Sequence, residues 1–299
     1  MTVPPKVAAA AATILWGFTY IVTTKMLPHN PMFIAAARAF GGGVPLLLLA
    51  RDVPPVRWWI KLVILGTLNS GLFFALLFVA AIRMPGGVTA TFQALGPLFI
   101  VLLAWPLLGA IPSRAKVLAA VAGAAGVSMV VLKGEEALDP IGLLAAFGAA
   151  FSVALGGALT HKWGRPSSVI SLTAWQMIVA GIELTAVALY LNDVPGSLNG
   201  LNVVGLSVLA LLVTALPFAL WFGAIRDAGA ASVAPMLLLT PLTAFALDAI
   251  FRAVVPTTLQ GIGMAVVIGS LLYGQHTDRR AFRVAHHHTQ MSKPKRPEI

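Results

Sequence analysis

The chain has 299 residues, of which 59% are hydrophobic and only 10% are charged, and its mean hydropathy is +0.91. So large an apolar fraction cannot be buried in one core, which excludes an ordinary soluble domain. The net charge of +10 could suggest a nucleic-acid partner, but in a membrane protein the first question is where the basic residues fall. The absence of cysteine excludes disulfides, thiolate metal sites and cysteine nucleophiles.

In chain order, ten apolar runs are long enough to cross about 30 Å of hydrocarbon as helices. The connections between them are short and polar, so the chain leaves no room for a soluble domain. The first run is longer than a signal-peptide core and has no cleavage-like site after it, so we expect it to be retained. The predicted spans are Val7–Met26, Pro31–Ala50, Ile60–Ala81, Pro85–Leu108, Ala115–Leu132, Pro140–His161, Ser168–Leu191, Leu201–Ala224, Ala230–Phe251 and Thr257–Gln275.

The second half of the sequence repeats the first. Ala81-Ile82-Arg83 recurs as Ala224-Ile225-Arg226, and each is followed by a small-residue helix that contains a proline, about 144 positions apart. A unit of five helices ends on the opposite side of the bilayer from where it began, so its copy must be inverted. Inverted repeats are typical of transporters that open alternately to the two sides around a site at their interface.

These patterns predict an all-α integral membrane protein with ten transmembrane helices, arranged as two inverted five-helix repeats around a central cavity. We expect a first repeat over residues 1–133, a second over 134–275 and a basic cytoplasmic tail over 276–299. If both termini are cytoplasmic, fifteen basic residues fall on the inner side and four on the outer side. This distribution favours cytoplasmic termini, and it accounts for the net charge through the bilayer and its anionic lipids, with no nucleic acid.

The first span carries a polar and aromatic stripe. Trp16, Thr19, Tyr20 and Thr23 fall on one face of a helix that advances 100° per residue. Such a face should lie against the bundle interior or a water-filled cavity, where Trp16, Tyr20 and Thr23 would bind a solute. The alternative is that the threonine hydroxyls join helices together or bond their own backbone.

Two amides, Asn69 and Gln93, lie near the middle of the membrane by their distance from the span ends. An unpaired amide at that depth is costly, so each needs a protein partner, a water molecule or a ligand. The sequence leaves open whether they bind the solute or pair with each other.

Two charges, Arg38 and Glu183, also lie deep in their spans, at depths that would let them meet. A charge at the centre of a helix costs about 2.5–3.5 kcal/mol on insertion scales, so both need compensation. One interpretation is a structural ion pair between the repeats. The other makes Arg38 an anchor for a substrate carboxylate and Glu183 a proton site coupled to transport. Asp248 and Arg252, four residues apart, are expected to form an interfacial pair.

Three prolines, Pro97, Pro217 and Pro241, are predicted hinges, because proline removes a backbone donor and bends a helix. Small residues recur every four positions in the fifth span, at Ala115, Ala119 and Gly123, and in the tenth, at Gly261, Ala265 and Gly269. Such faces allow close helix packing, either within one chain or across a dimer, so the sequence is compatible with a monomer or a homodimer.

No catalytic motif is present. H-E-x-x-H, the P-loop, G-x-S-x-G and paired intramembrane aspartates are all missing, so we expect no enzyme activity, no cofactor and no metal site. Without an ATP site, any transport must be driven by gradients.

The LWGFTYI opening, the Ala-Ile-Arg turn into a Gly/Pro helix and the two five-helix halves resemble the EamA-type members of the drug/metabolite transporter superfamily. The resemblance covers about 7–275. It implies a central substrate cavity and efflux of amino acids, metabolites or drugs across the bacterial inner membrane. Within that superfamily the chain looks most like the YddG-type exporters of aromatic and other amino acids.

The chain departs from the superfamily at acidic positions. Many members have an acidic residue just before the helix proline and another near the end of that helix; here these places hold Gly96 and Thr240, then Ala110 and Val254. A facilitated, gradient-driven exporter is therefore expected. Trp16 and Tyr20 keep the aromatic character of the first helix, which suits aromatic or large neutral amino acids as the solute. The alternatives are a passive solute channel, or a transporter of another class such as drugs or nucleotide-sugars.

Overall fold

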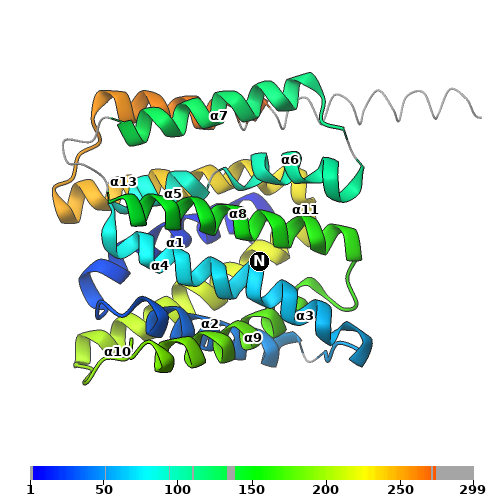
Figure 1. Cartoon of the computed structure of the whole chain (residues 1–299), viewed down its shortest axis with the longest axis vertical. Helices are drawn as coiled ribbons and strands as arrows, with labels where there is room; N and C mark the ends of the chain where they lie inside the picture. Colours follow the sequence, from blue (N-terminus) through cyan, green and yellow to red (C-terminus); the bar gives the residue numbers. More distant parts are fainter. Residues whose placement is uncertain are drawn as a thin grey trace, which may run out of the picture.

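The computed structural model describes residues 3–50, 52–93, 95–109, 111–132, 139–270 and 272–273, which form a bundle of helices (Figure 1). Within these residues, nine helical stretches are long and apolar enough to cross a membrane, and the shorter helix Thr258–Ser270 lies where the tenth span is predicted. Helices are the expected solution, because backbone groups in hydrocarbon must be bonded within their own segment. The all-α membrane fold is therefore confirmed, while the predicted tail over 276–299 lies outside the described residues.

The two halves contain corresponding elements. The first half comprises α1 (Pro5–Met26), α2 (Pro31–Ala50), the 3-10 turn η1 (Val56–Trp58), α3 (Trp59–Gly66), the π-helical η2 (Thr67–Leu72), α4 (Phe73–Arg83), α5 (Gly86–Gln93), α6 (Gly96–Leu108) and α7 (Arg114–Leu132). The second comprises α8 (Pro140–Trp163), α9 (Val169–Tyr190), α10 (Gly200–Ser207), the π-helical η3 (Val208–Ala215), α11 (Leu216–Ala228), α12 (Ala230–Val233), the 3-10 segment η4 (Ala234–Leu238), α13 (Leu239–Arg252) and the last helix, Thr258–Ser270.

The halves are packed crosswise. Helix α1 packs against α11 and α13 of the second half, while its repeat counterpart α8 packs against α4 and α6 of the first half. Helices α2 and α9, which are counterparts of each other, lie side by side (Figure 1). Each half thus supplies walls for the other, as expected of two inverted repeats around a central cavity.

Both halves interrupt their third span with a π-helical segment, η2 in the first and η3 in the second. A π turn leaves backbone carbonyls in need of other partners. In η2 the hydroxyl of Ser152 donates to the Leu68 carbonyl at 2.7 Å, and in η3 the hydroxyl of Thr214 donates to the Leu209 carbonyl, also at 2.7 Å. Side-chain hydroxyls therefore satisfy both interruptions inside the bundle.

The fifth span and the last helix pack together at one edge of the bundle (Figure 1). The contact is between backbones: a Cβ on Gly126 would lie 2.7 Å from the Gly263 carbonyl oxygen, and one on Gly263 would lie 2.6 Å from that of Gly126. Packing within one chain, one of the two expected arrangements, is therefore observed. The predicted face was partly wrong, because a Cβ on Gly261 or Gly269 would meet nothing within 4 Å.

Candidate functional site

A cavity of about 350 Å³ lies in the interior, where interrupted spans from the two halves meet. In the fourth span α5 ends at Gln93 and α6 begins at Gly96, and both of these residues contribute to the lining. The ninth span changes from 3-10 to α-helix between η4 and α13, and it contributes Leu237 and Thr240. Discontinuous helices of opposite halves that meet at one cavity are typical of binding sites in transporters.

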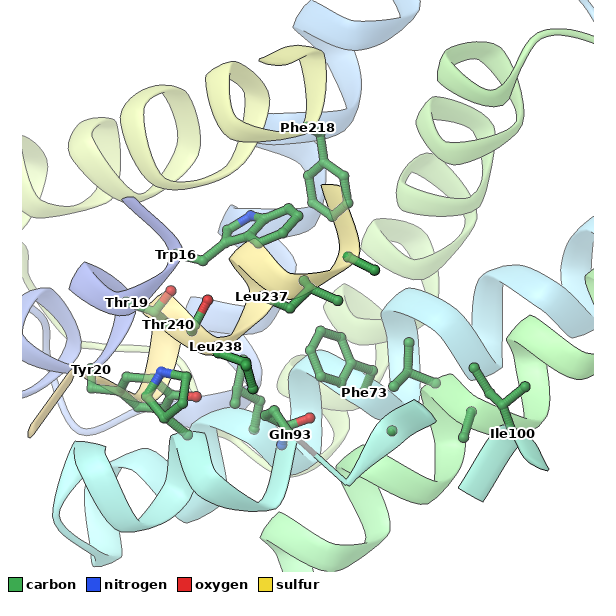
Figure 2. A pocket seen from close by; sticks show the side chains of 17 residues that line it. Trp16, Thr19, Tyr20, Phe73, Gln93, Ile100, Phe218, Leu237, Leu238 and Thr240 are labelled. Carbon is green, nitrogen blue, oxygen red and sulfur yellow. The ribbon is translucent and has the colours of Figure 1, made fainter. Parts of the chain in front are cut away.

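The cavity extends from Tyr20 to Ile100 (Figure 2). Tyr20 is 4% exposed, whereas Ile100 is 41% exposed. We call these the Tyr20 end and the Ile100 end. The lining therefore runs from the buried interior to a residue at the surface of the bundle. The complete lining is Trp16, Thr19, Tyr20, Phe73, Leu77, Ala90, Gln93, Gly96, Ile100, Val153, Ala154, Phe218, Ala234, Leu237, Leu238, Thr240 and Pro241.

Aromatic rings from three helices form much of the wall. The ring of Trp16 on α1 packs edge-on against Phe218 of α11, with centroids 5.2 Å apart, and lies 5.6 Å from Trp221 on the same helix. Tyr20 and Phe73 add two more rings to the lining (Figure 2). Such rings offer a large apolar contact surface that suits planar or apolar groups of a ligand.

Gln93, at the end of α5, is the amide of the lining. Its Nε2 atom is buried and has no hydrogen-bond partner among the described residues. A buried amide group without a partner costs about 1–3 kcal/mol, so a rotation that turns this amide toward a polar group in the cavity would be favourable. The amide can present a donor or an acceptor, since its two ends exchange by rotation.

A sequence model of the EamA-like transporter family matches residues 6–132 and 140–273, which together are most of the chain. The chain belongs to this family. It is 34% identical to Protein PecM of Dickeya dadantii (strain 3937), over 88% of this chain and 90% of that protein. It is 24% identical to the uncharacterized transporter YvbV of Bacillus subtilis (strain 168), over 88% of each chain.

One solved crystal structure has the same fold, with a TM-score of 0.65 and 20% identity, and covers 93% of this chain and 98% of that chain. Together these matches make the protein a multi-pass membrane transporter of the drug/metabolite class, and not an enzyme. They support the wider superfamily assignment and do not single out the YddG-type exporters.

In the first span of this EamA-like transporter, only part of the predicted polar and aromatic stripe lines the cavity. Trp16, Thr19 and Tyr20 line the cavity. Thr23 does not: it is buried, and its hydroxyl donates to the Thr19 carbonyl at 2.7 Å. Thr13 likewise donates to Ala9 of its own helix. One part of the stripe therefore lines the cavity and another part bonds its own helix backbone, while solute binding stays a prediction.

Arg38 lies behind the cavity wall and is 4% exposed. Its Nε donates to Thr214 at 3.1 Å, its Nη1 donates to the cavity-lining Thr19 at 3.4 Å, and its guanidinium carbon lies 4.7 Å from the Phe74 ring centroid. No carboxylate of the described residues forms an ion pair with it. The ring face and the hydroxyls hold the cation inside the bundle.

The suggested ion pair between Arg38 and Glu183 is wrong. Glu183 on α9 faces η2 instead, where its Oε1 accepts from the Thr67 hydroxyl at 2.7 Å. The suggested pairing of Asn69 with Gln93 is wrong as well. Asn69 donates to Gln176 of α9 at 2.9 Å and is not part of the lining. Depth alone suggested these pairs, but the side chains point to different neighbouring helices.

The three predicted hinge prolines all stand near the start of an α-helical segment. Pro97 and Pro217 occupy the first turns of α6 and α11, and Pro241 is the third residue of α13. The side chain of Pro97 lies outside the described part of the chain. Pro217 follows the π-helical η3 and Pro241 follows the 3-10 segment η4, so both stand where the helical hydrogen-bonding pattern changes inside a span. The role of the three prolines as hinges stays a prediction.

Several lining residues had no signal in the sequence. Phe73, Phe218 and Ile100 are apolar residues in apolar spans, and no periodicity separates a cavity-facing ring from a lipid-facing one there. The matched Gly96-Pro97 and Thr240-Pro241 pairs could have indicated the cavity, because residues of both pairs line it.

Proposed function

We propose that this EamA-like transporter exports aromatic or large neutral amino acids, or related small metabolites, by alternating access. Export is driven by gradients without ATP, across the inner membrane of a bacterium, with both termini in the cytoplasm. The bacterial relatives and the distribution of basic residues support this location and orientation.

The observation that carries the proposal is the cavity between the two interrupted spans. Its volume of about 350 Å³ suits a small molecule, and its wall combines aromatic rings with one unpartnered amide. A solute with an apolar or aromatic body and one polar group would match both features. In this proposal Trp16 and Tyr20 contact the body of the solute, and Gln93 bonds its polar group.

Arg38 does not line the cavity but contributes a positive charge next to it. Its guanidinium donates a hydrogen bond to the hydroxyl of Thr19, which lines the cavity, and it has no carboxylate partner among the described residues. A positive charge in a medium of low dielectric favours a nearby anion, which supports a solute that carries a carboxylate. Asn69 and Thr23, which were expected to contact the solute, would act by holding η2 and α1 in place.

The proposal is tested by counterflow in proteoliposomes with labelled Phe, Trp, Thr and a nucleotide-sugar, each with and without a pH gradient. We expect Phe and Trp to accumulate in the liposomes and the nucleotide-sugar not to accumulate. Its phosphates carry several negative charges, and among the described residues Arg38 is the buried cation next to the cavity, which is too little to compensate them. Accumulation of the nucleotide-sugar alone would contradict the amino-acid assignment.

Variants connect the flux to the cavity. Trp16→Ala and Gln93→Ala are expected to lower the flux at least about tenfold, since each removes one of the few specific contacts. Ile14→Ala is the matched control on the same helix, because Ile14 is 39% exposed and does not line the cavity. Flux equal to the unmodified protein in both cavity variants would exclude this site.

A passive channel is the second candidate, because the cavity lining reaches the surface of the bundle at Ile100. Trans-stimulation separates the two: a carrier loaded on the far side exchanges faster, whereas the flux through a pore is indifferent to the far side.

A further inference from the structure

The buried carboxylate of Asp248 sits where the two halves meet beyond the Tyr20 end of the cavity. It is 2% exposed, and it accepts the Gly87 N–H at 2.8 Å through Oδ2 while Oδ1 pairs with Arg252 at 3.3 Å. Gly87 belongs to α5 of the first half, and Asp248 and Arg252 belong to α13 of the second. A buried carboxylate is costly unless it is paired, and here both of its oxygens have partners.

At this contact α5 packs so closely on α1 and α13 that only glycine fits at two of its positions. A Cβ on Gly86 would overlap the Cβ of Tyr20, and a Cβ on Gly87 would overlap the ring of Phe245. The start of α5 therefore rests directly on α1 and α13. Because Tyr20 is also the buried end of the cavity lining, this α5–α13 contact closes the cavity at the Tyr20 end.

The contact exists in one copy, although the halves are repeats. About 144 positions along the chain, the counterparts of Gly86 and Gly87 are Ala230 and Ala231, and the counterpart of Asp248 is Ala104. The corresponding helices at the other end of the cavity, α12 and α6, are not packed together in the same way, since α12 packs on α1, α11 and η4. Among the described residues, the tight packing and the buried carboxylate at the Tyr20 end thus have no equivalent between α6 and α12.

We propose that Asp248 is the residue that holds the Tyr20 end of the cavity shut, so that breaking its bond to Gly87 opens this end. The inference rests on the alternating access of the proposed function. In the expected orientation the Tyr20 end faces outward, so the contact would close the cavity to the outside while the Ile100 end admits solute from the cytoplasm. Asp248 is a positioning residue here, since it does not line the cavity.

The test uses one engineered thiol, because the chain has no cysteine of its own. Ala234 lines the cavity and is half-buried, so Ala234→Cys reports access to it. A small membrane-impermeant methanethiosulfonate reagent is applied to right-side-out or inside-out vesicles without any solute. We expect labelling from one side only in this parent.

Adding Asp248→Ala to the parent is expected to raise labelling from the protected side about tenfold, the effect of losing a bond to a charged acceptor. Labelling of the Asp248→Asn variant from the protected side should lie between that of the parent and that of Asp248→Ala, since the amide oxygen can still accept from the Gly87 N–H. Asp227→Ala is the matched control, because Asp227 pairs with Arg226 at the surface and should leave labelling one-sided.

Gly87→Ala keeps the test decisive if the Asp248 variants fail to fold. Its Cβ would push α5 from Phe245 without changing the carboxylate, so it too should make labelling two-sided. Two-sided labelling of the parent, or one-sided labelling in folded Asp248 or Gly87 variants, would overturn the inference. Since no solute is used, failure of the counterflow assay alone would refute the proposed substrate and leave the Asp248 assignment standing.

Discussion

Arg38 of α2 donates a hydrogen bond from Nε to the Thr214 hydroxyl at 3.1 Å, within the π-helical segment η3. The other half has a bond in the corresponding place, where Asn69 of η2 donates to Gln176 of α9 at 2.9 Å. In both halves a polar side chain ties the π segment to the second span of the opposite half. The two contacts differ in which side donates and in charge, and the described residues place the Arg38 cation behind the cavity wall.

Thr214→Val should destabilise the protein. It removes the acceptor of the buried Arg38 Nε and the donor to the Leu209 carbonyl, and unsatisfied buried groups cost about 1–3 kcal/mol. The measurement is thermal unfolding in detergent. Thr185→Val is the control, because the hydroxyl of Thr185 bonds only to its own helix, at the Gly181 carbonyl. Equal melting temperatures for the two variants would show that the Arg38 contact contributes nothing to stability.

Gly126→Ala should destabilise the packing of α7 on the last helix. The added Cβ would lie 2.7 Å from a backbone oxygen of Gly263, and backbone cannot move aside as a side chain can, so we expect a loss of about 1–3 kcal/mol. Gly261→Ala adds the same group where nothing lies within 4 Å, and it should be neutral or slightly stabilising because alanine favours helix. Thermal unfolding of the two variants side by side checks this, and the reverse order of stability would refute the packing.

Glu183→Gln should flatten the pH dependence of counterflow. Among the described carboxylates within the spans, Glu183 has a hydroxyl partner, Thr67, but no cation, whereas Asp248 has Arg252. A carboxylate inside a span with no cation beside it is typical of coupling sites in transporters. The check is the initial rate of counterflow at several pH values. An unchanged rate with an unchanged pH profile would mean that Glu183 is structural.

Asp139 should contribute to stability in a pH-dependent way. It caps α8 by accepting the Gly142 N–H at 2.8 Å, and this bond, together with Arg83 at 3.1 Å, lowers the pKa of its carboxyl. A lowered folded-state pKa means that the contribution is complete above the ordinary aspartate pKa of about 3.9 and is lost as the pH falls through the folded value. The difference in melting temperature between the unmodified protein and Asp139→Ala should therefore shrink on acidification. A constant difference down to pH 3 would contradict this cause.

The cavity could be anticipated in part from single residues. Trp16, Tyr20 and Gln93 were expected to bind solute and do line the cavity, because a polar or aromatic group deep in a span has few places to face. Arg38, Asn69 and Thr23 met the same criterion but are held by Thr214, Gln176 and the backbone of α1. Depth in the membrane can be counted from the sequence, whereas the neighbouring helix that a side chain meets depends on how the helices are rotated.

The sequence by itself determined the spans and their duplication, because the cost of exposing backbone and charge to hydrocarbon acts along the chain and leaves a pattern in composition. Only the tertiary structure decided which residues line the cavity, which polar groups pair, and that Asp248 joins α13 to α5 beyond the Tyr20 end. Those features depend on crosswise contacts between residues such as Gly87 and Asp248, which are 161 positions apart. Contacts of this kind between the two halves depend on how the helices pack, and local patterns in the chain do not specify them.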